Sequence, residues 1–582
     1  MMKKSYVWAL LASMFMVGCS QNDDLPENPG EDQKVEKELS YIAINVNATP
    51  NAGGRAVADG GFTYGTADEN KVRDAYFFFF KVDGNPFVVN GYLPETGTGN
   101  ASAAGENWVK YTFTDAGQNQ AGTSNVERKM EAVLTLAKMK DSHPTYMVVV
   151  LGGQPVNTTA ISLTDLRQML INDYKNPDDY FIMSNSVYSD GTNGIYATAL
   201  TKGNFATSPD AAKASPVNVY VERVAARVGV GLNATKVVSG TNRFRVQNGG
   251  ADQTITIHGE STPTTVYAEI FGWDINTTIN HSYLMKDIAG FSTWSSDLGF
   301  TWSEANNFRS YWENTPHRTS DPVTTYDRTF DFNEFNDLAV KDYCLGNTND
   351  THKTKVIVRA QLQKEDGTPL NIASWLGNYY KFDDLKGIVA QSLSAGGTTL
   401  YYRHNDSEAW TLINQKVGGT VPGLGYIALL RGDGDTEDEG ADYYKATFTL
   451  DPSGNALQWS FDGTSALTDI PGATVAQQVA AKLQSLAPAK IWTNGHTYYF
   501  LNIEHLGNGS SKRNYGVVRN HAYEIIVDGI VGLGTPVYVT ETGTDFPEIP
   551  DPVIPDETET YLAAKINILS WALVSNNVIL GQ

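Results

Sequence analysis

The residue types that most often do chemistry in proteins are scattered along this chain without a catalytic spacing. Nine histidines occur, and none stands in an HExxH motif or within a cysteine and histidine cluster. Glu504 and His505 are neighbours, but no nucleophile in context completes a triad with them. No GxSxG motif and no phosphate-binding glycine loop is present. We therefore expect no enzyme and no bound cofactor.

An acidic loop contains a weak candidate for a metal site. Asp433, Asp435 and Glu437 alternate in a run that begins at Arg431, as the first ligands of a calcium loop would. The sixth position holds Asp438, where an EF-hand requires glycine. A solvated acidic loop is the simpler interpretation, with weak Ca²⁺ binding as the alternative. The Arg-Gly-Asp triplet at its start is too short to indicate a partner.

Three tryptophans offer a different chemistry, the stacking of aromatic rings on sugars. Trp273, Trp302 and Trp312 lie near the middle of the chain. Exposed, they would suit a glycan-binding surface, but β-sandwich cores use tryptophan as readily.

The N-terminus has the order of features found in a bacterial lipoprotein signal. Lys3 and Lys4 precede a short apolar run at 6–17, and Gly18-Cys19 follows it. We expect cleavage between Gly18 and Cys19 and lipidation of Cys19. Cys344 is then the remaining cysteine, so a disulfide framework is not expected.

The bulk composition indicates a soluble β-rich protein of more than one domain. The chain has 582 residues, 41% of them hydrophobic and 11% aromatic, with 53 glycines and 30 tyrosines. Its formal net charge is −22, which argues against nucleic acid as a partner because phosphates would repel it.

Two segments at opposite ends of the chain have the alternation of a strand with one buried face. Near the N-terminus, the alternating residues are Ile42, Ile44 and Val46. Near the C-terminus they are Leu562, Ala564, Ile566 and Ile568, with Trp571 and Leu573 extending the apolar contact. The linker 541–560, which precedes the C-terminal segment, holds prolines and acids, so we expect it to be extended. In the uncut chain we expect the tail to be disordered or loosely docked.

Between these ends the chain reads as many strands and few helices. One long strand is expected at 217–232, with Glu222 and Arg223 in the middle of its apolar run. Further strands are expected at 265–275, 354–364 and 521–530. We place a domain boundary near residue 232 and expect two β-sandwich domains.

Taken in order, several segments resemble the fimbrillins, the major subunits of Bacteroidetes type V pili, and especially the short-fimbria major subunit family. The segments are Gly18-Cys19, Gly53-Gly54-Arg55-Ala56, 181–185, 221–228, 272–276, 282–286, 343–347, 354–360, 516–523 and the linker before the terminal strand.

This resemblance implies an all-β fold with few short helices, made of two transthyretin-like, Greek-key β-sandwich domains and a C-terminal donor strand. It implies a signal peptide at 1–18, a lipidated propeptide at 19–55, an N-terminal domain at 56–232, a C-terminal domain at 233–540, a linker at 541–560 and a donor strand at 561–582.

The resemblance also implies how such a subunit assembles. A lipidated precursor in the outer membrane is cut by an Arg-specific protease between Arg55 and Ala56. The strand with Ile42, Ile44 and Val46 then leaves, and the C-terminal strand of another copy replaces it. The expected partners are further copies in a head-to-tail filament, minor or anchor subunits, the protease and the outer membrane. The mature location is a cell-surface fimbrium that serves adhesion.

Two alternatives remain open. The chain could be an accessory or tip fimbrial adhesin. It could instead be a surface glycan-binding lipoprotein that keeps its lipid at Cys19.

Overall fold

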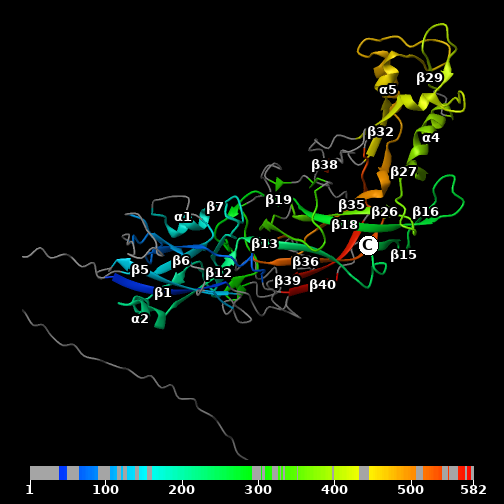
Figure 1. Cartoon of the computed structure of the whole chain (residues 1–582). Helices are drawn as coiled ribbons and strands as arrows, with labels where there is room; N and C mark the ends of the chain where they lie inside the picture. Colours follow the sequence, from blue (N-terminus) through cyan, green and yellow to red (C-terminus); the bar gives the residue numbers. More distant parts are fainter. Residues whose placement is uncertain are drawn as a thin grey trace, which may run out of the picture. The chain divides into compact units, whose positions relative to one another are not determined.

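Strands dominate the described chain, and helices are few and short (Figure 1). The longest helix, α4 (Phe382–Ala395), has 14 residues, and the others are α1 (Leu163–Gln168), α2 (Pro209–Ala214) and α5 (Val475–Gln484). The predicted all-β class with few helices is confirmed. No helix in the described part of the chain is long and apolar enough to cross a membrane.

The structure is a computed structural model. It describes residues 39–48, 65–89, 105–113, 119–121, 128–137, 143–153, 160–290, 303–304, 308–316, 326–327, 330–331, 334–349, 352–395, 399–431, 445–505, 516–539, 548–549, 561–569 and 573–577. For 39–48 and for the two C-terminal segments, the backbone pairing is what is described.

The first sheet contains the N-terminal strand in its interior. Its order is β3-β2-β6-β8-β12-β1-β5-β4, with β11 paired to β6. The bounds are β1 (Leu39–Ala48), β2 (Asp74–Phe80), β3 (Trp108–Thr112), β4 (Asn119–Ala121), β5 (Arg128–Ala137), β6 (Tyr146–Leu151), β8 (Met183–Asn185), β11 (Thr198–Ala199) and β12 (Val217–Arg223).

The continuous apolar run of β2 is explained by burial on both of its faces. Phe77 and Phe79 pack in one hydrophobic cluster with β5 and β12, while Phe78 and Phe80 pack in another with Val224. All seven residues of β2 are buried. A strand with one wet face would alternate, whereas one covered on both faces reads as an unbroken apolar run.

The second sheet follows the order β25-β13-β36-β14-β18-β26-β35-β37, with β15 paired to β14 and the hairpin β39-β40 added on β36. The bounds are β13 (Ala225–Leu232), β14 (Arg243–Asn248), β15 (Ala251–Asp252), β18 (Tyr267–Asn276), β25 (Lys341–Leu345), β26 (Lys355–Gln363), β35 (His496–Asn502), β36 (Ala522–Val531), β37 (Thr535–Pro536), β39 (Tyr561–Leu569) and β40 (Leu573–Asn577).

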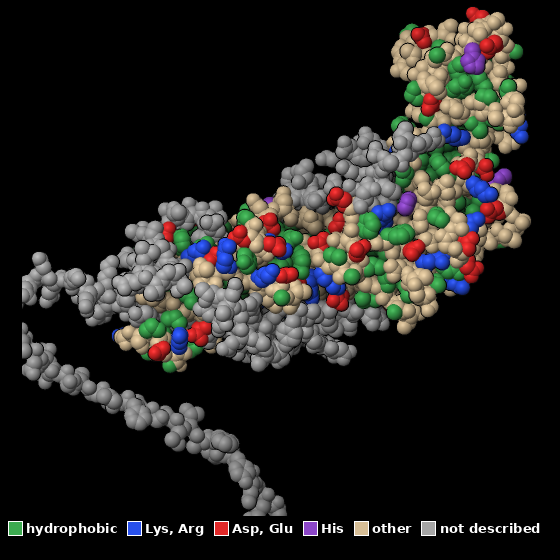
Figure 2. Space-filling model, in the orientation of Figure 1, with side chains coloured by type: hydrophobic (Ala, Val, Ile, Leu, Met, Phe, Trp, Pro, Cys, Tyr) green, Lys and Arg blue, Asp and Glu red, His purple; other side chains and the backbone are tan. Residues whose placement is uncertain are grey.

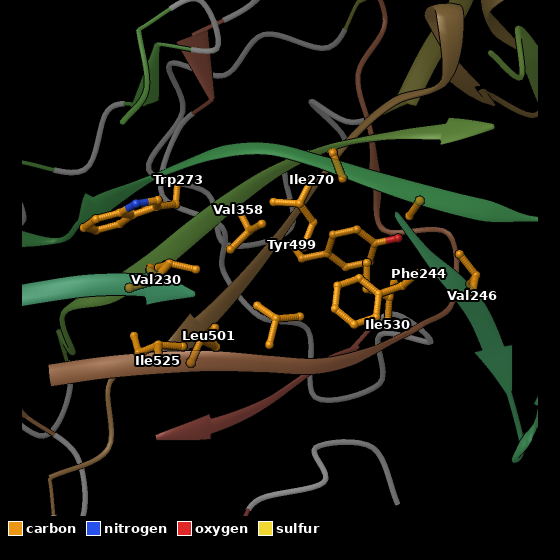
Figure 3. Close-up of a cluster of buried hydrophobic side chains, with 14 of the residues drawn as sticks. Val230, Phe244, Val246, Ile270, Trp273, Val358, Tyr499, Leu501, Ile525 and Ile530 are labelled. Carbon is orange, nitrogen blue, oxygen red and sulfur yellow. The ribbon is translucent and has the colours of Figure 1, made fainter. Parts of the chain in front are cut away.

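The core of the second sheet draws on strands far apart in sequence (Figure 3). Val230 of β13, Trp273 of β18, Val358 of β26 and Ile525 of β36 all belong to one cluster, and Trp273 is fully buried. Trp273 is therefore a core residue.

The strand expected at 217–232 is two strands that belong to different sheets. β12 ends at Arg223 in the first sheet, and β13 begins at Ala225 in the second. Val224 separates them, is fully buried, and donates its backbone N–H to the carbonyl of Ile182. The chain therefore passes from the first sheet to the second at Val224. The assignment of domains to 56–232 and 233–540 stays a prediction.

A lobe of two small sheets and two helices, residues 372–492, is inserted between β26 and β35. It has its own hydrophobic cluster, to which Trp375, Leu385, Val479 and Trp459 belong. We did not expect this lobe or its helices. Its sheets have the orders β28-β27-β34-β32-β31 and β30-β29-β33, from β27 (Ile372–Trp375), β28 (Asn378–Lys381), β29 (Tyr401–Arg403), β30 (Thr411–Leu412), β31 (Ile427–Arg431), β32 (Lys445–Leu450), β33 (Gln458–Ser460) and β34 (Ala489–Trp492).

Short pairs complete the described strands. On the described part of the face shown in Figure 2, acidic and basic side chains are interspersed among uncharged ones. The pairs are β7 (Leu170–Ile171) with β20 (Ser282–Tyr283), β9 (Tyr188–Ser189) with β10 (Gly194–Ile195), β16 (Thr254–Ile255) with β17 (Thr264–Thr265), β19 (Thr278–Ile279) with β23 (Tyr326–Asp327), β21 (Ser303–Glu304) with β22 (Arg309–Ser310), and β24 (Phe330–Asp331) with β38 (Glu548–Ile549).

Candidate functional site

The N-terminal strand β1 lies between two other strands of the first sheet. On one side it pairs antiparallel with β5 over ten residue pairs, from Leu39 with Ala137 to Ala48 with Arg128. On the other it pairs parallel with β12 over five, from Ile44 with Val217 to Ala48 with Val221. Removing β1 would therefore leave two facing strand edges without partners.

The register places the predicted apolar residues of β1 beside core residues of β5. Ile42 lies opposite Leu134, Ile44 opposite Ala132, and Val46 opposite Met130. These three β5 residues are at most 2% exposed and belong to the cluster shared with Phe77 and Phe79. We name the position of β1 between β5 and β12 the slot.

On the β12 side, the slot is bounded by residues of the same core. Ile44 lies opposite Val217, and Val46 lies opposite Val219. Val219 is fully buried and Val217 is 6% exposed. A strand that occupies the slot must therefore carry apolar residues at every second position.

The C-terminal strand β39 is paired with the chain's own second sheet. It runs antiparallel to β36 over nine residue pairs, with a bulge between Val527 and Gly529, and forms a hairpin with β40. For the uncut chain we expected a tail that is disordered or loosely docked; the structure pairs its backbone with the edge of β36, in the second sheet and not the first. The exposed edge of β36 and an alternating apolar strand satisfy each other, which explains why the tail pairs there.

The register of β39 uses the residues predicted for the donor strand. Leu562, Ala564, Ile566 and Ile568 lie opposite Ile530, Val527, Ile525 and Tyr523, respectively. These β36 residues belong to the core of the second sheet (Figure 3). The tail therefore presents one alternating set of positions to a core, as a slot occupant must, and Leu573 lies in β40 opposite Leu569.

Glu69 joins the segment before β2 to both sheets, through its carboxylate to the second sheet and its backbone carbonyl to the first. Glu69, 1% exposed, accepts hydrogen bonds from Arg227 at 3.0 Å and from the Tyr343 hydroxyl at 2.6 Å. Arg223 donates to the Glu69 carbonyl at 3.0 Å and also to Asn70. Burial raises the pKa of Glu69, but Arg227 and these hydrogen bonds outweigh burial and hold the pKa below its ordinary value.

Two further buried ion pairs lie near the change of sheets. Glu222 and Lys286 are 2.7 Å apart with no exposed side-chain surface, and Lys286 also donates to the Ser310 carbonyl at 2.9 Å. Glu313 and Arg519 are also 2.7 Å apart and unexposed. Burial lowers the pKa of Lys286, although Glu222 and Glu313 oppose this shift. Such pairs fix the packing of the segments that carry them.

His505 is a structural histidine in a closed hydrogen-bond chain. Its Nε2 faces the Tyr311 carbonyl at 2.7 Å and must donate, so in the neutral ring Nδ1 accepts from the Tyr523 hydroxyl at 2.8 Å. That hydroxyl accepts from the Val518 N–H at 2.8 Å. Burial lowers the pKa of His505 to about 4, which favours the neutral ring.

The sequence candidates have different outcomes. Trp273 is fully buried and Trp312 is 4% exposed, so neither is a sugar-stacking platform. No group of His, Cys, Asp or Glu among the residues that the structure describes could hold a metal. Outside the described residues lie Gly18, Cys19, Arg55, Ala56, Trp302, Asp433, Asp435, Glu437 and Trp571.

Sequence reasoning missed the partners of the buried charges. Glu222 and Arg223 stood out as charges within an apolar run, which was a signal that a partner must exist. Lys286 and Glu69 could not be assigned to them, because 64 and 154 residues separate the pairs.

Comparison with known proteins places the C-terminal region in a family. Residues 490–577 match the model described as "Major fimbrial subunit protein type IV, Fimbrillin, C-terminal". The matched residues contain β35, β36 and the C-terminal hairpin. The resemblance to the fimbrillins is thereby confirmed in this region. A search of the curated proteins found no match.

Solved structures of low sequence identity also align with the chain. A fimbrilin (fimA) from Porphyromonas gingivalis is 9% identical, with 92% of this chain and 98% of that chain covered and a TM-score of 0.33. The tip fimbrial protein Mfa3 of the same organism is 11% identical, with 92% and 100% covered and a TM-score of 0.26. A fimbrial assembly protein from Parabacteroides distasonis is 10% identical, with 56% and 87% covered and a TM-score of 0.26.

Proposed function

Because residues 490–577 match the model of a fimbrillin C-terminal region, we propose that the chain is a structural subunit of a cell-surface fimbrium. In this proposal it is the major stalk subunit, polymerises by strand exchange and serves adhesion. The observation that carries the proposal is the interior position of β1 in the first sheet, between β5 and β12. An interior strand that can be cut from its own chain leaves a slot for the strand of another copy.

The exchange begins with the precursor. It is held at the outer membrane by a lipid on Cys19, and an Arg-specific protease cuts between Arg55 and Ala56. The next arginine, Arg73, is a poorer site, because its carbonyl accepts the N–H of Phe113 and its side chain pairs with Asp74 and Asp178. After the cut, no peptide bond joins β1 to the rest of the chain.

The replacement is driven by the cost of an empty slot. Burial of an aliphatic side chain is worth about 1.5–3 kcal/mol, as an upper estimate, and each ladder hydrogen bond adds about 0.5–1.5 kcal/mol. Leu562, Ala564, Ile566 and Ile568 match the alternation of Ile42, Ile44 and Val46. Repeated head-to-tail, such an exchange does not close on itself and builds a filament.

The tail has two possible acceptors in this scheme, which are β36 of its own chain and the slot of another copy. Leaving β36 exposes the strand edge with which β39 pairs. Both β36 and the slot place alternate residues of the tail opposite core residues. The free energy lost when the tail leaves β36 is therefore offset by the free energy gained when it enters the slot. Assembly then needs a cut precursor on one side and a released tail on the other.

Two variants test the proposal. Deletion of 561–582 should give a folded, cut subunit that forms no filament, and filaments from this truncation would refute strand exchange. Arg55→Ala should stay lipidated and unassembled, with Arg73→Ala as the matched control that assembles normally. N-terminal sequencing of filaments should find Ala56. The number of copies of this subunit relative to the other filament proteins distinguishes a stalk subunit from an accessory or tip subunit.

A further inference from the structure

The strand pair β12 and β13 makes a direct connection between the slot and the sheet that bears the tail. β12 forms one wall of the slot through residues 217–221. A single residue, Val224, joins it to β13, which pairs parallel with β36 over six residue pairs. β36 in turn leads toward the C-terminal tail. In a head-to-tail filament, a pull on one subunit enters at the slot and leaves at the tail.

We propose that residues 217–232 form the tension path of the subunit, and that β13 and β36 resist tension by shearing against each other. This inference rests on the proposed function, since the filament defines the two points of pull. The slot occupant pulls β13 from its N-terminal end through Val224. The linker reaches the C-terminal end of β36, at Val531, through β37, which pairs with β35 at two positions.

The direction of these pulls follows from the pairing. Arg227 lies opposite Ala522 and Leu232 opposite Val527, so the two strands run the same way. Pulls on the N-terminal end of one and the C-terminal end of the other act in opposite directions along the pair. All the ladder hydrogen bonds then bear the force together, because none can open before the others.

Hydrogen bonds beyond the ladder lengthen the sheared contact at both ends. At the beginning, the Asn520 N–H donates to the Ala225 carbonyl at 2.6 Å. At the end, the Asn233 N–H donates to the Val527 carbonyl at 2.9 Å, and its side chain donates to Asp528 at 2.7 Å. The contact therefore extends past the six pairs.

The charges within the apolar run hold the path laterally. Glu222 binds Lys286, Arg223 binds the segment at Glu69, and Arg227 binds the Glu69 carboxylate. All three residues are at most 5% exposed. A displacement of the strand along its axis would break each of these contacts. Because the contacts are buried and water cannot solvate the separated charges, this break is costly. This explains why charged residues stand where the two sheets meet.

The decisive experiment is single-molecule pulling of the full chain in monomeric form. Handles are attached through click-reactive residues introduced at Asn218, in β12, and Val531, at the end of β36. A disulfide between Gly231→Cys and Ile526→Cys then links the two strands. These positions are register partners and both are partly exposed. The added side chain at Gly231 would meet mainly the Ile526 side chain, which the second substitution removes.

In the oxidised molecule, the first rupture event seen at the wild-type force should be absent. Reduction of the same molecule should restore this event. Equal rupture forces before and after reduction would overturn the proposal. Without the disulfide, Glu222→Gln should raise the rupture rate about tenfold at constant force, because an unfolding rate follows interactions lost before the transition state.

The control is Arg403→Ala, which breaks the ion pair with Asp406 in the lobe at 372–492, outside the pulled strands. It should leave the rupture rate at these handles near the wild-type value. An equal increase in both variants would refute the lateral role of Glu222. Because the molecule is a monomer, these outcomes are independent of filament formation, which the deletion of 561–582 tests separately.

Discussion

The carboxylate of Glu222 lies 2.7 Å from the ammonium group of Lys286, and neither side chain is exposed. The two residues are 64 positions apart and connect the end of β12 to the segment after β20. A buried pair of this kind contributes little net stability when intact, but the loss of one partner leaves an uncompensated charge in the core.

Lys286→Met should therefore lower the free energy of unfolding by about 3–5 kcal/mol, because it leaves Glu222 buried without its partner. The double variant Glu222→Leu/Lys286→Met should recover most of that loss. Urea unfolding followed by tryptophan fluorescence measures both. Arg245→Ala, which breaks the exposed pair with Asp252, is the control and should leave the midpoint unchanged. Equal loss in the single and double variants would contradict this account.

Acid should destabilise the fold through His505, whose pKa is lowered to about 4 from an ordinary 6.5. Between these values the unfolded chain binds a proton that the folded chain does not. The neutral His505 ring therefore makes its full contribution to the free energy of unfolding above about pH 6.5. This contribution falls by about 3 kcal/mol as the pH decreases to 4. Unfolding free energies of wild type and His505→Gln, measured from pH 7 to pH 4.5, should converge at the acid end. Parallel curves would exclude His505 as the source.

A charge in β1 should affect the precursor and spare the mature subunit. Ile44 lies opposite Ala132 and Val217, both core residues, so Ile44→Asp should lower the melting temperature of the uncut chain. After a cut at Arg55, the substitution leaves with the propeptide, and the mature subunits of variant and wild type become identical. Asn45→Ser is the control in the same strand. A defect that persists in the cut and separated subunit would mean that β1 stays in the slot.

A charge in β39 should have the opposite behaviour and persist after the cut. Ile566 lies opposite the buried Ile525 of β36, so Ile566→Asp should release the tail and expose that edge. Hydrogen exchange should then accelerate at the amides of Ala522–Val531, and filaments should not form. Asn567→Ser, at the neighbouring position on the other face, should change neither. Unchanged exchange in β36 would show that the tail does not depend on this register.

Much of the strand content could be predicted from local patterns. The expected strands at 265–275 and 521–530 correspond to Tyr267–Asn276 and Ala522–Val531, because alternation within a strand reflects its own two faces. The run 217–232 was misassigned as one strand, since both halves are apolar and a change of sheet at Val224 leaves no turn residue.

The buried charges and the lobe were beyond such patterns for different reasons. Glu69 and Arg227 meet through tertiary packing across 158 residues, which no periodicity encodes. Helix α5 did carry a local signal, since Thr474 and Gln477 form a capping box at its start.

The lobe at 372–492 has a consequence for how the protein can be modified. Its two ends join β26 and β35, which pair directly with each other from Lys355 with Asn502 to Gln361 with His496. The lobe therefore occupies the place of a hairpin turn, and its entry and exit lie side by side. Ile372 and Trp492, at its two ends, belong to the core of the second sheet and have to be kept. Exchanging the residues between them for a short turn, or for a foreign domain with adjacent termini, should leave both large sheets in place. A filament of this subunit would then be a scaffold that displays a chosen cargo once per repeat.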